Sequence, residues 1–207
     1  MPKTTPTPKS RELAPRRRRA ARAAGRPLVA ARPRRARVGR HQRLLRVCKQ
    51  TALHPAGAAA LGERLLALVE AIEAEAGELA DGVGGMTLGA DPLATAVSLA
   101  AWRRGRTLPA FIVRKTPKAH GTEAYVEGRA SLPAAARVIL LEDVVTSGGS
   151  TLQAAARVRG ERMEPFGVAC IVDRQAGGMQ RLAEDGLRAR ALFTRADFEA
   201  LAAGETP

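Results

Sequence analysis

The stretch Val138–Ala154, VILLEDVVTSGGSTLQA, decides the fold of this chain. It begins with four apolar residues, passes through the acids Glu142 and Asp143, and continues through a turn of small residues into a helical segment. A continuous apolar run of this kind is typical of a central strand that is covered on both faces. The stretch therefore predicts a buried strand that leads through a short turn into a helix, as in a parallel α/β sheet.

The segments on either side continue this alternation. The apolar residues within residues 55–76 recur at spacings of three and four, which predicts a helix with one packed face. The other expected helices are residues 91–104, 150–159, 178–184 and 195–203, and the expected strands are residues 81–85, 110–113, 137–141, 168–172 and 189–193. Residues 114–128 are polar and aperiodic, so we expect a long functional loop there. The order predicts an α/β fold with a mostly parallel sheet flanked by helices.

The charge divides the chain into two parts. Residues 1–46 hold 16 of the 34 lysines and arginines and a single acid, for a net charge of +15. Residues 47–207 hold 18 bases and 19 acids, for a net charge of −1. We therefore expect an Arg-rich, disordered segment over 1–46 and one folded domain over 47–207. Because the domain itself is nearly neutral, the high overall charge says nothing about the partners of the domain, and we do not expect nucleic acid among them.

Cysteine usage and hydropathy limit the cellular setting. Cys48 and Cys170 stand far apart, without the spacing of a disulfide framework or a zinc site. No apolar run approaches the roughly 18 residues that a membrane span needs, and no signal-peptide core follows the basic N-terminus. We therefore expect a cytoplasmic protein with no membrane partner.

The acids and small residues of the deciding stretch indicate a phosphorylated sugar as ligand. Backbone N–H groups of Thr146–Ser150, at the start of a helix, can bind a phosphate group, and glycines permit its close approach. Glu142 and Asp143 can accept hydrogen bonds from sugar hydroxyls, although an acid pair after a strand can also simply cap a turn. GxxxxGK[ST] and GxGxxG are both absent, which argues against ATP and NAD as ligands.

Four stretches, in the expected order, resemble the orotate phosphoribosyltransferase family of type I phosphoribosyltransferases over about residues 47–207. Val138–Ala154 resembles the phosphoribosyl pyrophosphate (PRPP) signature, Val113–Gly128 the catalytic loop, Val83–Ala96 the loop near the pyrophosphate, and Ile171–Gly178 an orotate-contacting turn. The resemblance implies a type I phosphoribosyltransferase fold whose N-terminal hood is atypical or missing. It also implies an enzyme of pyrimidine biosynthesis that transfers the phosphoribosyl group of PRPP to orotate, giving orotidine 5′-monophosphate and pyrophosphate.

The resemblance further implies the roles of individual residues. Lys118 and Asp143 would be catalytic. PRPP would be bound by Arg114, Lys115, Lys118, His120, Glu142, Asp143, Val144, Val145, Thr146, Ser147, Gly148, Gly149 and Ser150, and orotate by Thr146 and Arg174. The cations of the loop would stabilise the departing pyrophosphate, and a guanidinium suits the carboxylate of orotate.

The family also implies a cofactor and an assembly. Mg²⁺ would be carried mainly by pyrophosphate and ribose oxygens, so no metal-binding residue is expected in the chain. Family members work as homodimers, and the resemblance implies that the loop over residues 114–128 acts in the site of the other subunit.

The N-terminus departs from the family, whose members carry a Ser-Gly and Tyr-Tyr-Asp segment that closes over the pyrimidine. Here the resemblance resumes near Cys48, after the Arg-rich segment. One hypothesis is that residues 13–46 are a reading-frame displacement in GC-rich DNA, which predicts impaired turnover. Two other functions remain open: a PRPP-sensing regulator whose basic tail binds nucleic acid, and a phosphoribosyltransferase for another base.

Overall fold

The computed structural model describes residues 47–117 and 124–203. All of these residues belong to the second of two units into which the chain divides, residues 1–37 and 38–207. A helical segment over residues 47–52 comes first. It is followed by α2 (Pro55–Ala76), β1 (Gly82–Met86), α3 (Asp91–Arg103), β2 (Ala110–Val113), β3 (Val126–Glu127), the 3-10 turn η1 (Arg129–Ser131), β4 (Arg137–Val145), α4 (Gly149–Gly160), β5 (Glu164–Asp173), α5 (Gly178–Glu184), β6 (Arg188–Thr194) and α6 (Arg195–Ala203).

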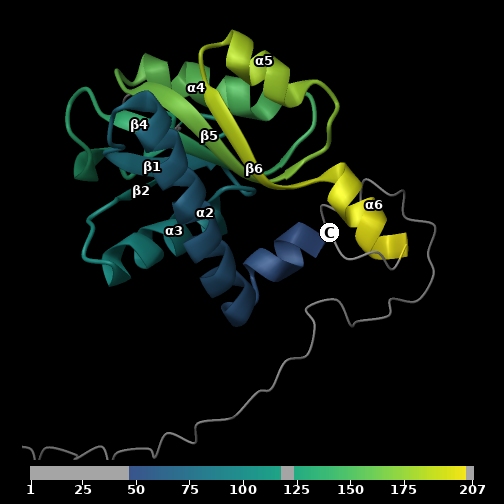
Figure 1. Cartoon of the computed structure of the whole chain (residues 1–207). Coiled ribbons are helices and arrows are strands. Elements are labelled where there is room, and N and C mark those ends of the chain that lie inside the picture. The colour runs from purple at the N-terminus through teal and green to yellow at the C-terminus, as the bar shows by residue number, and fades with distance from the viewer. Residues whose placement is uncertain (1–46, 118–123, 204–207) are drawn as a thin grey trace, which may run out of the picture. The chain divides into compact units, whose positions relative to one another are not determined.

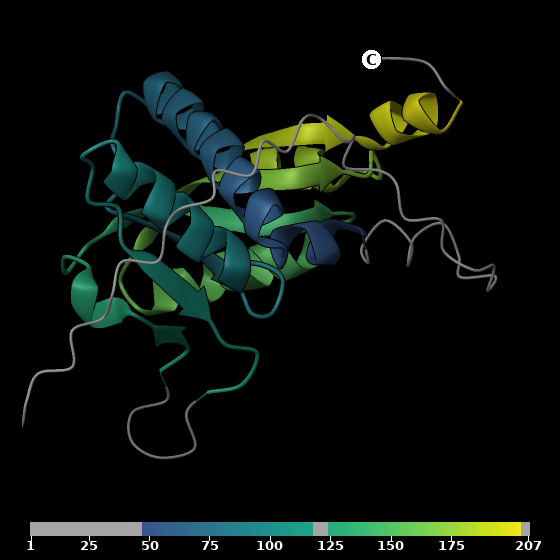
Figure 2. The same cartoon turned by 90° about the horizontal axis from the view of Figure 1, so that it is seen from below.

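The strands form one sheet in the order β3-β2-β1-β4-β5-β6. Neighbours from β2 to β6 run parallel, and only β3 is antiparallel, against β2. Figure 2 shows the parallel strands pointing toward one edge of the sheet, so their carboxyl ends lie together. The expected α/β fold with a mostly parallel sheet flanked by helices is confirmed.

Helices cover both faces of the sheet and enclose two apolar cores. α2 and α3 pack on one face, with Leu65, Val69 and Val97 among the buried side chains. α4 and α5 lie on the other side of the sheet, where Val158 and Leu182 are buried (Figure 1). β4 lies between the two cores and is buried from its second residue to its last, as expected for a central strand.

Local sequence explains where α2 begins and ends. Pro55 occupies the first turn, where its missing N–H removes no helical hydrogen bond. Gly77 follows the last residue with φ at 69°, a left-handed conformation that favours glycine and ends the helix. The chain can then turn directly from α2 into β1.

Three elements differ from the sequence prediction. The strand expected over residues 168–172 is β5, which runs from Glu164 to Asp173 because its first residues pair with the start of β4. β4 was expected to end at residue 141, but it continues to Val145, because Val144 and Val145 still pair with β5. The two acids therefore lie within the strand and not after it. The expected loop over residues 114–128 contains β3, which pairs with the end of β2 while Val126 is buried in the core.

The two edges of the sheet differ in length and charge. β3 has only two residues, whereas β6 has seven and is half-buried to exposed along its whole length. Arg188 and Arg190 alternate along β6, and Arg190 forms an ion pair with Glu75 of α2. None of the helices in the described residues is long and apolar enough to cross a membrane.

Candidate functional site

The site lies where the chain changes direction across the sheet. From β1 the chain passes through α3 to β2 on one side, whereas from β4 it passes through α4 to β5 on the other. β1 and β4 are neighbours, so the chain leaves them toward opposite faces of the sheet, and ligands of open α/β sheets bind in the crevice outside such a point. The two loops, residues 87–90 and 146–148, belong to the stretches that resemble the family's PRPP-contacting segments.

Two buried carboxylates of β4 lie at this point of the sheet. Glu142 is 5% exposed and Asp143 is 7% exposed. Glu142 Oε2 accepts hydrogen bonds from Ser150 Oγ at 2.9 Å and Thr151 Oγ1 at 3.3 Å. Asp143 Oδ1 accepts one from the Val144 N–H at 2.8 Å. The pair is thus held by neutral donors and tied to the first turn of α4.

Gly89, in the loop after β1, lies directly against both carboxylates. A Cβ at this position would be 2.9 Å from Glu142 Oε1 and 3.1 Å from Asp143 Oδ1. The loop is held nearby by Thr87, whose Oγ1 donates to Asp91 Oδ2 at 2.8 Å. Gly89 lies within Val83–Ala96, the stretch that resembles the loop near the pyrophosphate, but it was not predicted as a site residue. The available signal was a glycine two residues before the helix start at Asp91-Pro92.

Burial changes the acid strength of the pair. Burial, together with the charge of Asp143, raises the pKa of Glu142 to about 7, while the hydrogen bond from Ser150 opposes the change. In the described part of the chain, no lysine, arginine or histidine pairs with either carboxylate. A ligand that supplies hydroxyl donors or positive charge would therefore stabilise the ionised form.

The loop after β4 has the geometry of a phosphate site. Gly148 has φ at 74°, which favours glycine and turns the chain into α4. α4 starts at Gly149, and its first N–H groups have no partner within the helix, so they can donate to an anion. Thr146–Ser150 therefore stand where the sequence predicted a phosphate cradle.

The turn after β5 packs on this loop. The Arg174 N–H donates to the Val145 carbonyl at 3.0 Å, which brings Arg174 beside Thr146, the other predicted orotate contact. A Cβ at Gly178 would lie 2.5 Å from the Thr146 carbonyl oxygen. Arg181 Nη1 donates to the Ser147 carbonyl at 2.7 Å. Gly178 and Arg181 support the loop and were not predicted as site residues, because their contacts arise only from packing.

The remaining predicted residues follow β2, at the same edge of the sheet. Arg114 Nη1 donates to Glu127 Oε1 at 2.9 Å, and Lys115 is exposed. Lys118 and His120 lie outside the described residues. The structure thus brings Glu142–Ser150 and Arg174 together and places the first residues after β2 at the same carboxyl edge.

Several curated proteins similar to this chain are orotate phosphoribosyltransferases. An orotate phosphoribosyltransferase of Nostoc sp. is 44% identical over 151 residues, which cover 73% of this chain and 69% of that protein. One of Rhodopirellula baltica is 40% identical over 151 residues, which cover 73% of this chain and 77% of that protein. No protein-family model matches the chain.

Solved structures give the same result. Mycobacterium tuberculosis orotate phosphoribosyltransferase in complex with PRPP is 35% identical, with a TM-score of 0.58, over 73% of this chain and 82% of that one. A phosphoribosyltransferase of Corynebacterium diphtheriae is 34% identical, with a TM-score of 0.61, over 73% of this chain and 82% of that one. The sequence identities and the coverage point to one family, and the position of the candidate site between β1 and β4 is consistent with it. The chain belongs to the orotate phosphoribosyltransferase family.

Proposed function

We propose that this protein transfers the phosphoribosyl group of PRPP to N1 of orotate and releases pyrophosphate, a step of pyrimidine biosynthesis. The observation that carries the proposal is the buried pair Glu142 and Asp143. The pair is approached by Gly89 from the loop after β1 and tied to the start of α4 by Ser150. This arrangement offers a phosphate cradle and two hydroxyl acceptors within one crevice.

Each part of the site has a task in the reaction. Thr146–Ser150 bind the 5′-phosphate through backbone N–H groups, and Glu142 and Asp143 accept hydrogen bonds from the ribose hydroxyls. Arg174 pairs with the orotate carboxylate. Breaking the C1–oxygen bond leaves positive charge on the ribose and negative charge on pyrophosphate, so Arg114 and Lys115 belong at the leaving group.

Lys118 and His120 have the same proposed place at the leaving group, on the resemblance of their stretch to the family's catalytic loop. Lys118 is the cation to which we assign the catalytic role there, beside Asp143 in the crevice.

Magnesium suits this set of donors. Mg²⁺ keeps several waters and is usually held by one or two carboxylates together with substrate phosphates, and it would neutralise charge on the pyrophosphate. In the described residues, no three acid, histidine or cysteine side chains converge to form a metal cage. Glu142 and Asp143 would face the ion through the ribose hydroxyls that they bind.

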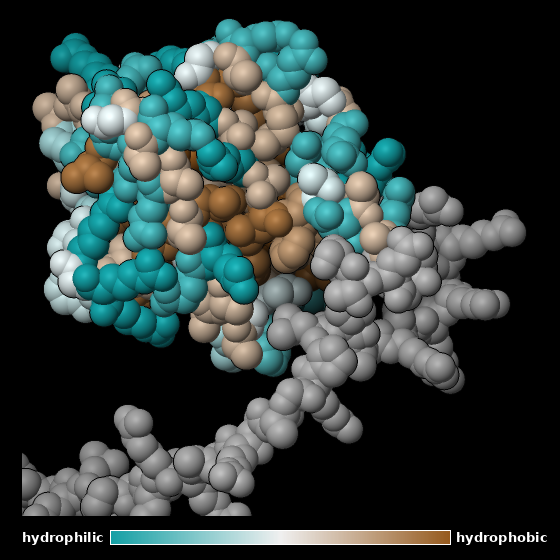
Figure 3. Space-filling view, in the orientation of Figure 1, coloured by the Kyte–Doolittle hydropathy of each residue, from teal (hydrophilic) through white to brown (hydrophobic). Residues whose placement is uncertain are grey.

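A homodimer is the proposed assembly, with residues 114–128 acting in the partner's site. It is supported by Leu99 and Trp102, three positions apart on α3, which are 52% and 67% exposed. On the face shown in Figure 3, apolar side chains gather near the centre, with polar ones around them. Mixing inactive Lys118→Ala and Asp143→Asn proteins should restore roughly a quarter of the activity, since half the dimers would contain one intact site. No recovery after proven subunit exchange would place both residues in one subunit's site.

The decisive test is formation of orotidine 5′-monophosphate from orotate, PRPP and Mg²⁺, with other pyrimidine and purine bases assayed in parallel. Of the bases tested with PRPP and Mg²⁺, we expect only orotate to be turned over. PRPP with Mg²⁺ should also raise the melting temperature, because PRPP binds only the folded state. Turnover with another base would reassign the acceptor. An unchanged melting curve at millimolar PRPP, together with no turnover, would overturn the proposed site.

The expectations for residues 1–46 lie outside the described residues. We infer from the composition of residues 13–46 that they are a frame displacement, with weak turnover but retained PRPP binding. Translation of the other frames upstream of Cys48 should give a Ser-Gly and Tyr-Tyr-Asp segment, and restoring that frame should raise activity. Absence of such a segment in every frame would contradict the hypothesis.

A further inference from the structure

Arg157 of α4 contacts the backbone at the end of β2. Its Nη1 donates to the Arg114 carbonyl at 2.7 Å, and its Nη2 donates to the Lys115 carbonyl at 2.9 Å. A planar guanidinium presents its donors in a fixed fork, so two bonds to successive carbonyls fix both position and direction. Arg157 therefore determines where the chain leaves β2.

The same side chain also contacts β1 and the residue before β3. The guanidinium carbon lies 4.6 Å from the centroid of the Tyr125 ring, within range of a cation–π interaction. Nη1 lies 3.5 Å from Met86 Sδ, at the last residue of β1. Glu161, just after α4, accepts a hydrogen bond from the Tyr125 N–H at 2.9 Å. The C-terminal end of α4 thus holds the ends of β1 and β2 and the start of β3.

These contacts connect two parts of the PRPP site. α4 begins at the phosphate loop, where Gly149 and Ser150 are its first residues, and Arg157 lies about two turns further along the helix. Among the described residues, the contacts of Arg157 are carbonyl oxygens, an aromatic ring and a thioether, with no acidic partner. Its charge is therefore used to hold backbone and not to balance a carboxylate.

We propose that Arg157 is a positioning residue for PRPP, which fixes Arg114 and Lys115 relative to the phosphate loop at the other end of α4. The inference rests on the proposed function, because it takes Arg114 and Lys115 as contacts of the pyrophosphate. In the proposed function, PRPP would reach across both ends of this arrangement, with its 5′-phosphate at the start of α4 and its pyrophosphate near Arg114 and Lys115, after β2.

Arg159 provides a matched control on the same helix. Its Nη1 forms an ion pair with Asp185 Oδ2 at 2.8 Å, and its side chain is 37% exposed. Arg159→Met removes an arginine and its hydrogen bonds to Asp185 from α4, and within the described residues these bonds do not involve residues 114–117 or Tyr125. Arg157→Met keeps the length of the side chain but removes every donor, whereas Arg157→Lys keeps the charge and loses the fork.

The experiment measures KM for PRPP, KM for orotate, kcat and melting temperature in the full chain, with PRPP binding measured by calorimetry. We expect KM and Kd for PRPP to rise roughly tenfold to a hundredfold in Arg157→Met, with KM for orotate changed less than about twofold. Arg157→Lys should recover part of the loss, and Arg159→Met should match the parent in both constants.

Two results would overturn the inference in distinguishable ways. If the parent binds PRPP and Arg157→Met shows only a lower melting temperature, with unchanged KM and Kd for PRPP, Arg157 is structural and the proposed function stands. If the parent protein neither binds PRPP nor turns over, the proposed function fails and this inference fails with it.

Discussion

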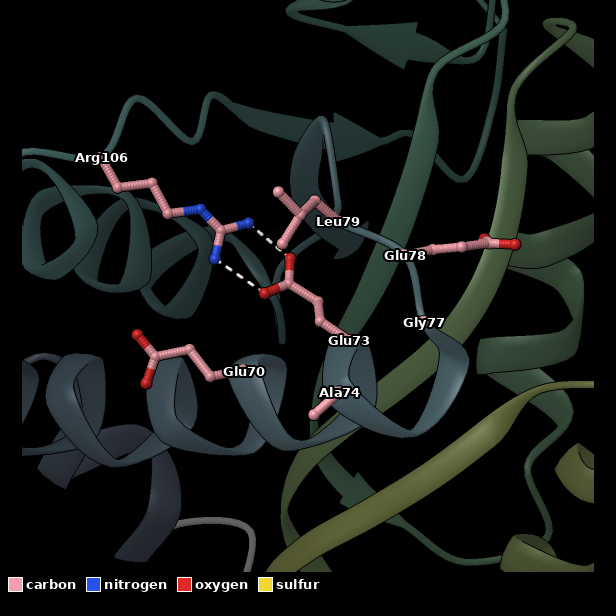
Figure 4. A pocket seen from close by; sticks show the side chains of 7 residues that line it. All are labelled: Glu70, Glu73, Ala74, Gly77, Glu78, Leu79 and Arg106. Atoms are coloured by element: carbon pink, nitrogen blue, oxygen red, sulfur yellow. Dashed lines mark hydrogen bonds and ion pairs between the residues drawn. The ribbon is translucent and has the colours of Figure 1, made fainter.

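Buried carboxylates occur near both the amino ends and the carboxyl ends of the parallel strands, but their hydrogen-bonding groups are satisfied in different ways. Near the amino ends of the strands, Glu73 of α2 is 4% exposed and forms an ion pair with Arg106, with Nη1 and Oε2 2.8 Å apart (Figure 4). Glu73 Oε1 also accepts the Ala80 N–H at 2.7 Å. At the carboxyl edge, Glu142 and Asp143 have only hydroxyl and backbone donors within the described residues.

The difference separates a structural acid from a binding one. Glu73 has a complete set of partners, so the pocket beside it needs no ligand; it is lined by Glu70, Glu73, Ala74, Gly77, Glu78, Leu79 and Arg106. Within the described residues, Glu142 and Asp143 have no cationic partner, so they retain unused acceptor capacity and a mutual repulsion that a ligand can relieve. A buried acid without a basic partner is thus the better indicator of the site in this molecule.

The largest expected effect is from Asp143→Asn, which removes the charge and keeps the shape. We expect turnover to fall about a hundredfold or more, because electrostatic stabilisation in a buried site is worth at least that much. The PRPP-induced rise in melting temperature should mostly disappear. Activity close to that of the parent would contradict the distinction between the structural acid Glu73 and the binding acids Glu142 and Asp143.

Gly89→Ala should have the next largest effect, because the added methyl group would meet both carboxylates within 3.1 Å. We expect kcat/KM for PRPP to fall roughly tenfold, since the loop must move from its place. Gly160→Ala is the control, because a Cβ there has nothing within 4 Å. Equal activity of the two variants would show that the loop after β1 does not need to approach the acids so closely.

The raised pKa of Glu142 predicts a pH dependence with a definite sign. Because the folded protein binds this proton more tightly than the unfolded chain, the contribution of Glu142 to stability is greatest below its ordinary pKa of 4.5 and is lost as pH rises through about 7. PRPP binding should strengthen over the same range, as hydroxyl donors prefer the carboxylate. Melting curves between about pH 5 and pH 7.5 should show a smaller loss of stability in Glu142→Gln than in the parent; parallel curves would contradict the assignment.

Glu73→Gln should have the smallest effect on activity. Breaking a buried ion pair costs roughly 3 kcal/mol, which lowers the melting temperature by about 6–12 °C in a protein of this size. KM and kcat should stay within about twofold of the parent when they are measured well below the melting temperature. A tenfold rise in KM for PRPP would show that the region around Glu73, near the amino ends of the strands, also contributes to PRPP binding.

Much of the fold and part of the site could be predicted from the sequence because their signals are local. The apolar run before Glu142, the small residues of 146–150 and the helical spacing in α2 all lie within short windows. The end of β4 was not predicted correctly, because Val144 and Val145 belong to the strand only through their pairing with β5.

The contacts of Gly178 and Arg157 could not be predicted for a related reason. Gly178 meets Thr146 and Arg157 meets Arg114 across gaps of 32 and 43 residues. Neither pattern differs locally from an ordinary helix start or an ordinary exposed arginine. Residues that support the site through such long-range contacts can therefore be identified only from the three-dimensional structure.

The edge strands have a consequence for how the folded protein behaves at high concentration. A long, flat and apolar edge strand offers unpaired N–H and C=O groups to other molecules and promotes aggregation. Here β3 ends after two residues, and β6 carries Arg188 and Arg190 at alternate positions. Addition of a second copy of β6 along this strand would bring the positive charges of two molecules close together, which opposes the pairing. The sheet is thereby discouraged from extending beyond its own molecule.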